Sequence, residues 1–201
     1  KSNTVVKTRI AVPSLGASNY AIFCSRGAEA SDNTFTLFWI KSKGYRWDYA
    51  TANTVMSKSG ITADLSAEIE CSGNGCWLNG VKISAEYEPV DYEPANRMML
   101  FASYTGDPSE TPVASDNFAK VRFYSMQILE EGKLKVDLWP CVDENGRYGI
   151  YDKIAEKTYY SASDTDFAPR FILEPGHDYV IDGDKGAGPE KIYVNNASLT
   201  L

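Results

Sequence analysis

Short apolar runs alternate along the chain with polar, turn-forming residues, and this pattern predicts β-strands rather than helices. Strand-like runs cover residues 5–12, 20–24, 35–40, 45–50, 67–71, 76–78, 81–83, 98–101, 121–129, 134–139, 148–151 and 157–160. Asn79-Gly80 is the strongest hairpin signal, and Glu131-Gly132 and Glu144-Asn145-Gly146 separate later strands. Ala52 to Ser59 fits at most one helical turn. The whole pattern is typical of an all-β protein, a two-sheet antiparallel sandwich or jelly roll.

The composition changes after Phe167, where proline and glycine interrupt a polar tail. Three apolar triplets lie in this tail, at 171–173, 179–181 and 192–194. Three such pieces are too few to bury a core alone. We therefore predict one domain over residues 1–168 and a short strand-containing tail over 169–201. The tail either adds strands to the sandwich or leads to a neighbouring unit.

Composition and charge exclude several classes of partner. The chain has 201 residues, of which 43% are hydrophobic and 23% charged, as in ordinary globular domains. Its net charge of -7 argues against binding to nucleic acid or to anionic lipid. A membrane-spanning helix needs about 20 apolar residues in a row, and the sequence has no such run. We therefore predict neither a nucleic-acid partner nor membrane insertion.

The four cysteines are Cys24, Cys71, Cys76 and Cys141. Cys71 and Cys76 flank the turn-rich tetrad 72–75, so a disulfide across a hairpin mouth and two reduced thiols both fit. The spacing does not match a zinc site, and no metal site is predicted. His177, the only histidine, lies in a turn-like stretch and is a poor candidate for a catalytic base.

The segment from Lys120 onward carries the most specific motifs. A strand over Phe123-Tyr124-Ser125-Met126-Gln127-Ile128 leads to Gly132-Lys133-Leu134, and then come Trp139-Pro140-Cys141, Gly146-Arg147-Tyr148-Gly149-Ile150-Tyr151-Asp152 and Tyr159-Tyr160-Ser161. Upstream lie Arg46-Trp47-Asp48-Tyr49 and Leu78-Asn79-Gly80. From about Thr4 to Phe167 the chain resembles the concanavalin A-like, laminin G-type jelly-roll domains of gut-bacterial surface and phage proteins. The resemblance implies the concanavalin A-like lectin/glucanase fold and an extracellular or cell-surface location.

The fold implied by this resemblance also hosts glucanases, whose carboxylates lie at positions i, i+2 and i+4 on one strand face. Glu68 and Glu70 share a face, but Ser72 takes the third position. Glu86 and Glu88 are followed by Val90 at the third position, after a proline. The hydrolytic pattern is missing in both places, so each pair is interpreted as a solvated strand face and the chain is predicted not to be an enzyme.

Calcium is the one cofactor that the resemblance suggests, because laminin G-type folds sometimes bind it at the rim formed by their loops. Asp164-Thr165-Asp166 and Asp182-Gly183-Asp184 offer carboxylates at short spacing. Neither completes a calcium-loop signature, so solvated turns are the simpler interpretation. We predict no cofactor.

An aromatic cluster is the most suggestive binding feature. Tyr45, Trp47 and Tyr49 share one strand face. If the preceding loop has three residues, Trp39 pairs with Trp47 and lies on that face; a two-residue loop sends it to the other face. Aromatic rings stack on the C–H faces of sugars. The forked N–H donors of an arginine guanidinium and the oxygens of a carboxylate bind sugar hydroxyls. The candidate ligand-binding residues are Trp39, Arg46, Trp47, Asp48 and Tyr49, with core packing as the alternative for one of the two faces.

Together these features predict a non-catalytic extracellular binding module whose ligand is a glycan or a surface protein. Two alternatives stay open: a structural or assembly module of a surface or phage particle protein, and an accessory domain of a polysaccharide-degrading enzyme or a divergent hydrolase. The oligomeric state is also left open.

Overall fold

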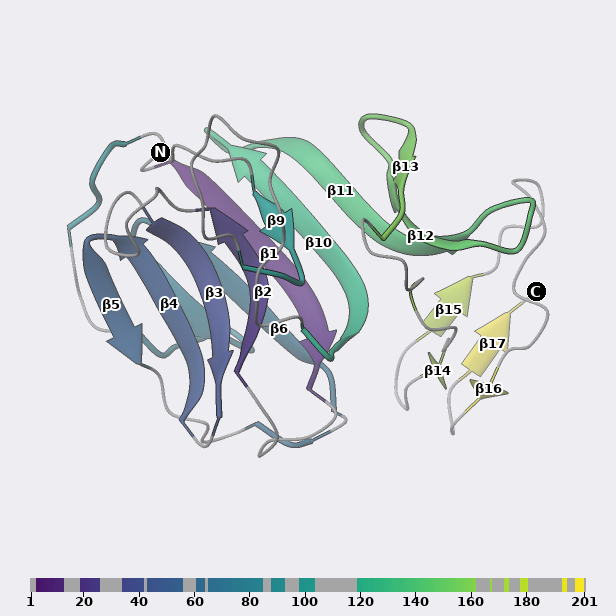
Figure 1. The fold of residues 1–201 in the computed structure, drawn as a ribbon, viewed down its shortest axis with the longest axis horizontal. Helices are drawn as coiled ribbons and strands as arrows, with labels where there is room; N and C mark the ends of the chain where they lie inside the picture. Colours follow the sequence, from purple (N-terminus) through teal and green to yellow (C-terminus); the bar gives the residue numbers. More distant parts are fainter. Residues whose placement is uncertain are drawn as a thin grey trace. The chain divides into compact units, whose positions relative to one another are not determined.

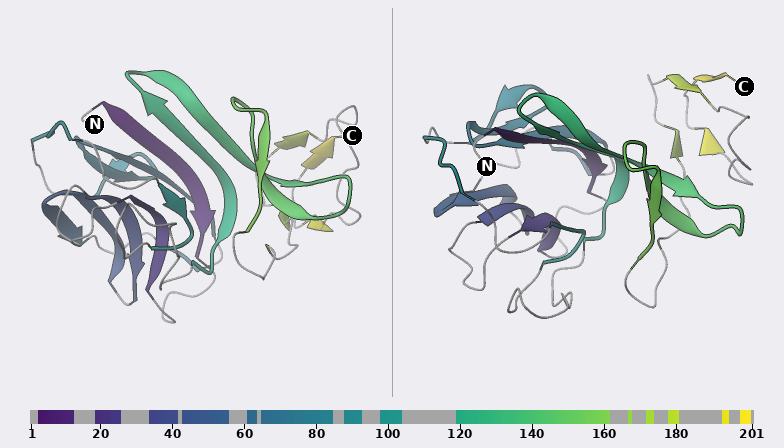
Figure 2. Two further views of the ribbon diagram at one scale, coloured as in Figure 1. Left: turned by 45° about the horizontal axis from the view of Figure 1, so that its top comes forward. Right: turned by 90° about the horizontal axis from the view of Figure 1, so that it is seen from above.

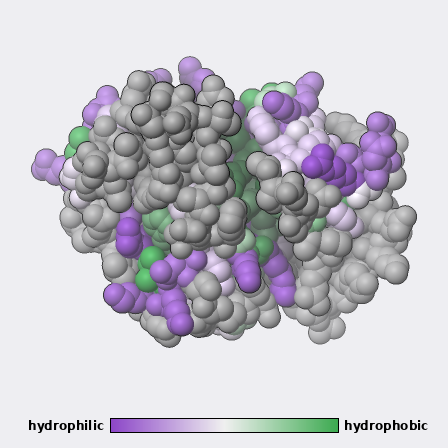
Figure 3. All heavy atoms as spheres, in the orientation of Figure 1, coloured by the Kyte–Doolittle hydropathy of each residue, from purple (hydrophilic) through white to green (hydrophobic). Residues whose placement is uncertain are grey.

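The computed structural model is all-β, and its described part contains no helix. It describes residues 3–12, 19–25, 34–41, 43–55, 61–63, 65–84, 88–92, 98–103, 119–161, 167, 172–173, 178–180, 193–194 and 198–200. Accordingly, no helix in these ranges could cross a membrane. Hydrophilic side chains dominate the part of the described surface visible in Figure 3. The chain divides into two compact units, Lys1–Val136 and Asp137–Leu201, which are described separately below.

Two antiparallel sheets contain most of the strands, consistent with a β-sandwich (Figure 1). The smaller sheet has the order β5-β4-β3-β2-β9, with bounds Ala52–Val55, Gly44–Ala50, Thr34–Ile40, Tyr20–Ser25 and Met99–Leu100. The larger sheet has the order β13-β12-β11-β10-β1-β6-β7-β8, with bounds Lys157–Tyr159, Tyr148–Asp152, Lys133–Val142, Arg122–Glu130, Thr4–Ala11, Ala67–Ser72, Gly75–Leu78 and Val81–Lys82. The all-β prediction is confirmed.

Turn residues end the strands at the predicted places. Asn79 and Gly80 have φ angles of 48° and 79°, and Glu131 and Gly132 have φ angles of 52° and 74°. Positive φ at both central residues gives the twist that a tight hairpin needs, which is why Asn-Gly suits the turn between β7 and β8. The expected helical turn over Ala52 to Ser59 is wrong for its first half, because Ala52–Val55 pairs with β4 as strand β5, and residues 56–59 lie outside the described residues.

In the unit Lys1–Val136 the two sheets form two layers with the core between them (Figure 2). The smaller sheet contributes a cluster of rings: Phe35 packs edge-on against Trp47 at 4.8 Å between centroids, and Trp39 against Tyr45 at 5.2 Å. The larger sheet contributes smaller apolar side chains, Val6, Ile10, Ile69, Cys71, Cys76 and Met126, which are all buried. Large rings on one layer thus pack against small groups on the other.

The unit Asp137–Leu201 contains most of β11 together with β12 and β13, which pair as successive antiparallel hairpins. In the tail, β14 (Ile172–Leu173) pairs in parallel with β16 (Tyr193–Val194), and β15 (Asp178–Val180) pairs in parallel with β17 (Ser198–Thr200). The described tail strands therefore pair with one another. The proposed domain boundary at residue 168 stays a prediction.

Candidate functional site

The aromatic residues predicted to bind a ligand are buried in this structure. Trp39 and Trp47 have no exposed surface, and Tyr49 is 1% exposed. Trp39 pairs with Tyr45 rather than with Trp47, because β3 and β4 stay paired up to Ile40 and Gly44. Tyr45 and Trp47 are two residues apart on β4 and point to the same side. Trp39, the partner of Tyr45, therefore shares that face with Trp47, as the three-residue loop predicts.

Burial changes what these rings can do. A ring that solvent does not reach offers no surface to a sugar, so in this conformation the three side chains pack the core. Burial, with smaller contributions from the Cys71 and Cys76 thiols of the facing sheet, raises the pKa of Tyr45 above its usual range. That interaction places the aromatic face of β4 toward the larger sheet. The core alternative therefore accounts for Trp39, Trp47 and Tyr49.

Arg46 and Asp48 occupy the other face of β4 and bind each other. Nε of Arg46 lies 2.7 Å from Oδ1 of Asp48, and Nη2 lies 2.5 Å from Oδ2. The Asp48 side chain is 2% exposed and that of Arg46 is 33% exposed. The guanidinium also lies 5.3 Å from the centroid of the Phe38 ring. This forked ion pair raises the pKa of Arg46 and uses the donor and acceptor groups that were expected to bind sugar hydroxyls.

A different surface, the outward face of the larger sheet, carries side chains suited to binding. Strand β1 alternates from Val6 to Ile10: Val6, Thr8 and Ile10 are buried, whereas Lys7 and Arg9 point outward. The neighbouring strand β10 places Gln127 opposite Lys7 and Ser125 opposite Arg9. Cross-strand partners lie on the same side of a sheet, so these four polar side chains share one face.

Strand β6 extends this face on the other side of β1. Glu70 lies opposite Lys7, and Glu68 lies opposite Arg9. On the next strand, β7, Trp77 is the partner of Glu70. The Trp77 ring is half-buried, with Nζ of Lys82 at 5.5 Å from its centroid. Charged, amide and aromatic groups from four adjacent strands therefore meet on one surface.

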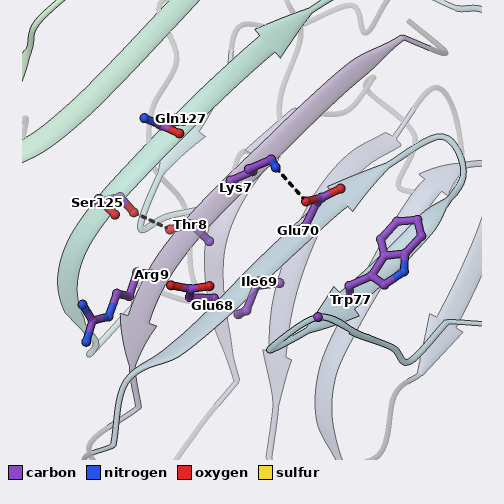
Figure 4. A pocket seen from close by; sticks show the side chains of 10 residues that line it. Lys7, Thr8, Arg9, Glu68, Ile69, Glu70, Trp77, Ser125 and Gln127 are labelled. Atoms are coloured by element: carbon purple, nitrogen blue, oxygen red, sulfur yellow. Dashed lines mark hydrogen bonds and ion pairs between the residues drawn. The ribbon is translucent and has the colours of Figure 1, made fainter. Parts of the chain in front are cut away.

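These side chains line a hollow of about 410 Å³ (Figure 4). Its lining residues are Lys7, Thr8, Arg9, Glu68, Ile69, Glu70, Trp77, Gly80, Ser125 and Gln127. Small-ligand sites typically have volumes of about 300–1,000 Å³. The hollow is thus large enough for a small ligand, and all its residues belong to one compact unit.

Hydrogen bonds hold the charged groups of the hollow in place. Nζ of Lys7 lies 3.0 Å from Oε2 of Glu70, and these side chains are 50% and 40% exposed. Nε and Nη2 of Arg9 donate to the hydroxyl of Ser66 at 3.0 and 2.9 Å. The Arg9 guanidinium also lies 5.2 Å from the centre of the Tyr124 ring. Donor and acceptor groups therefore lie side by side in the hollow, and Lys7 and Glu70 are accessible to solvent.

The sequence analysis did not single out Lys7, Arg9, Trp77 or Gln127, and it assigned Glu68 and Glu70 to a solvated strand face. The alternation in β1 and β6 does signal a polar outward face. The Cys76–Leu78 run reads as continuously apolar, so only the register with β6 shows that Trp77 points outward.

Several residues that the sequence analysis considered for catalysis or calcium binding, and set aside, lie outside the described part of the chain. They are Glu86, Asp164, Thr165, Asp166, His177, Asp182, Gly183 and Asp184. Within the described ranges, no group of three or more His, Cys, Asp or Glu side chains is arranged to hold a metal ion.

Comparison with known proteins adds no relative. No protein-family model matches the chain, and no curated protein or solved structure is significantly similar to it. The concanavalin A-like resemblance therefore rests on the sequence motifs alone.

Proposed function

We propose that the chain is a non-catalytic, concanavalin A-like jelly-roll module of an extracellular or cell-surface protein, and that it binds carbohydrate in the hollow on the outward face of the larger sheet. The observation that carries this proposal is the placement of Trp77, the Lys7–Glu70 pair and Gln127 around one solvent-accessible hollow.

The chemistry of the hollow matches a ligand rich in hydroxyl groups. Each sugar hydroxyl both donates and accepts hydrogen bonds, so neighbouring hydroxyls are well matched by an ammonium beside a carboxylate. Lys7 and Glu70 offer that combination with 3.0 Å between their charged atoms, and Gln127 lies beside Lys7. Charges of both signs line the hollow, which favours a neutral sugar over a strongly anionic one.

The Trp77 ring supplies the apolar contact that such a ligand needs. Trp77 and Glu70 are cross-strand partners on β7 and β6, so one ligand can contact the ring and the carboxylate together. Indole rings combine a large apolar surface with little conformational entropy to lose on binding.

The non-catalytic part of the proposal rests on the carboxylates. Glu68 and Glu70 project from the outward face, but Glu70 is ion-paired with Lys7 and Ser72, at the third position, is buried. In the glucanase pattern the carboxylates lie at positions i, i+2 and i+4 of one strand face, where they flank the scissile bond. Strand β6 supplies no third carboxylate at the position where the glucanase pattern has one.

A glycan array followed by calorimetry tests the proposal. We expect binding of at least one neutral glycan, with dissociation constants in the micromolar to millimolar range typical of small open sites, and loss of that binding in Trp77→Ala. The matched control is Trp139→Ala, since Trp139 is also partly exposed, with Nζ of Lys153 4.2 Å from its ring centroid, but belongs to the other unit. Absence of binding at millimolar sugar, or equal loss in both variants, would refute the site.

A second variant separates binding from folding. Lys7→Ala removes one member of an exposed ion pair, so it should change the free energy of unfolding by less than about 1 kcal/mol. It should nevertheless weaken sugar binding about tenfold, since a hydrogen bond to a charged group contributes about 1.5 kcal/mol or more. Turnover of any polysaccharide that disappears in Glu70→Gln would show a hydrolase instead.

A further inference from the structure

Cys71 and Cys76 are direct partners across the β6–β7 hairpin. Their Sγ atoms lie 3.3 Å apart, and both side chains are fully buried. The pair is on the inward face of the sheet, next to the Ser72–Gly75 pair that flanks the Gly73-Asn74 turn. Two thiols at this separation need only a small movement to reach the S–S bond length of about 2.05 Å.

We propose that Cys71 and Cys76 become joined in a disulfide when the chain folds in the presence of a small-molecule disulfide such as oxidised glutathione, and that this bond clamps the hairpin that carries Glu70 and Trp77. The bond itself does not depend on the proposed function. Its effect on ligand binding does, and the two are measured separately below.

The position in the sheet supports bond formation. Directly opposite residues of an antiparallel pair have Cβ atoms about 4.5–5.5 Å apart and a disulfide needs about 3.5–4.5 Å, so the bond requires the two strands to move slightly closer together. The observed contact between the two Sγ atoms shows that both side chains already point toward each other. The other two cysteines differ, because Cys24 contacts the Thr36 hydroxyl at 3.5 Å and Cys141 belongs to the other unit.

The chemistry balances as two exchange steps. The thiolate of one cysteine attacks oxidised glutathione, which forms a mixed disulfide and releases one glutathione. The second cysteine then attacks the protein sulfur of the mixed disulfide, forms the Cys71–Cys76 bond and releases the second glutathione. Two protein thiols are oxidised, one glutathione disulfide is reduced, and the two thiol protons end on the two released glutathiones.

The folded state determines when this exchange can occur. Burial, reinforced by the hydrogen bond with Cys76, raises the pKa of the Cys71 thiol well above its usual value. A protonated, buried thiol is a poor nucleophile and is closed to glutathione. The exchange therefore belongs to the folding chain, before the two sheets close over the pair, and the finished bond is shielded from reductants.

The disulfide would affect the neighbouring cross-strand pair, Glu70 and Trp77, which lines the hollow. Side chains alternate along β6 and β7, so Cys71 and Cys76 point inward while their sequence neighbours Glu70 and Trp77 point outward as the next pair. A covalent link between the strands fixes the spacing of that outward pair. We expect the clamp to reduce local opening of the hairpin.

The test unfolds the full chain with reductant and refolds it in a glutathione redox buffer, so that access to the thiols is not limiting. Alkylation and peptide mass spectrometry should then find Cys71 and Cys76 linked, lighter by two hydrogens, and Cys24 and Cys141 alkylated. The oxidised protein should melt about 4–8 °C above the reduced one, as expected for a bond that closes so short a loop in a chain of this size. The proposal is overturned if Cys71 and Cys76 are recovered alkylated, or joined to glutathione or to another cysteine.

Two further measurements separate the effect of the Cys71–Cys76 bond from effects of the other cysteines and from sugar binding. The Cys141→Ser variant should form the bond and show the same melting shift, whereas Cys76→Ser should leave Cys71 free and show no shift between oxidising and reducing buffer. If Cys76→Ser does not fold, peptide mapping of the unmodified chain still decides. Sugar affinity is measured on both redox forms: a linked protein that binds no sugar contradicts the proposed function and leaves the disulfide standing.

Discussion

The Tyr49 hydroxyl on β4 donates a hydrogen bond to the carbonyl oxygen of Val90 at 2.5 Å and accepts one from the amide of the same residue at 3.2 Å. One phenol thus satisfies both backbone groups of a residue 41 positions away in the sequence. A second tyrosine contributes nearby, since the Tyr92 hydroxyl donates to the backbone carbonyl of Thr34. The described segment 88–92 is held against the smaller sheet by side-chain hydroxyls instead of by strand pairing.

Replacing Tyr49 with phenylalanine removes both hydrogen bonds and keeps the ring. We expect the free energy of unfolding in urea to fall by about 1–2 kcal/mol, because the Val90 groups lose their partner. The control is Tyr159→Phe, at an exposed tyrosine of β13, which should change stability by less than about 0.5 kcal/mol. Equal effects of the two substitutions would show that the Tyr49 hydroxyl has no special structural role.

The Arg46–Asp48 pair leads to a prediction about coupling. Arg46→Met leaves the buried Asp48 carboxylate without its forked partner, so we expect a loss of about 3 kcal/mol in stability. The double variant Arg46→Met/Asp48→Leu removes both charges and should be more stable than Arg46→Met alone. A double variant with additive losses would contradict the structural role of the pair. The measurement is urea denaturation of the two single variants and the double variant.

Gly75, where strand β7 begins, has a φ angle of 136°, which side chains rarely adopt. A Cβ atom there would lie 2.5 Å from Oγ of Ser84 and 2.8 Å from Cε of Lys82. Gly75→Ala should therefore cost about 2–3 kcal/mol, from backbone strain and crowding together. The matched control is Gly80→Ala, where φ is also positive but no atom lies within 4 Å of the added Cβ. It should cost only about 1 kcal/mol, and the reverse order would refute this account of the hairpin.

The buried Tyr45 and Cys71 make stability sensitive to alkaline pH. Desolvation raises the pKa of both groups in the folded chain. Their stabilising contribution is complete below the unfolded pKa values, about 8.5 for cysteine and 10 for tyrosine, and is lost as pH rises above them. We expect the melting temperature of the reduced protein to fall progressively from about pH 8.5. Tyr45→Phe should flatten the decline above about pH 10, and an unchanged slope would contradict the prediction.

The strands and hairpins were predictable because they depend on local signals. Asn79-Gly80 and Glu131-Gly132 are found at the expected turns with positive φ, and the alternation in β1 matches its buried and exposed faces. Strand β5 was missed because Ala52–Val55 carries no alternation of its own and is defined by pairing with β4.

The candidate site was harder to predict because it depends on which face of a strand turns inward. Strand β4 is aromatic on one face and carries Arg46 and Asp48 on the other, and both faces are suitable for a ligand when read alone. In the structure the aromatic face of β4 packs the core, and Arg46 and Asp48 bind each other. The outward face of the larger sheet combines residues from four strands, and that combination follows from pairing between segments more than 100 residues apart, such as Lys7 with Gln127.

The four tryptophans are divided between the interior and the surface, and this division gives the protein built-in optical reporters. Trp39 and Trp47 are fully buried, and their indole nitrogens have no hydrogen-bond partner. Trp77 lines the hollow, and Trp139 is 39% exposed. Fluorescence from the first two should therefore be short in wavelength and insensitive to acrylamide until the chain unfolds. Quenching of the remaining emission should respond to sugar through Trp77, so one spectrum can follow folding and ligand occupancy separately.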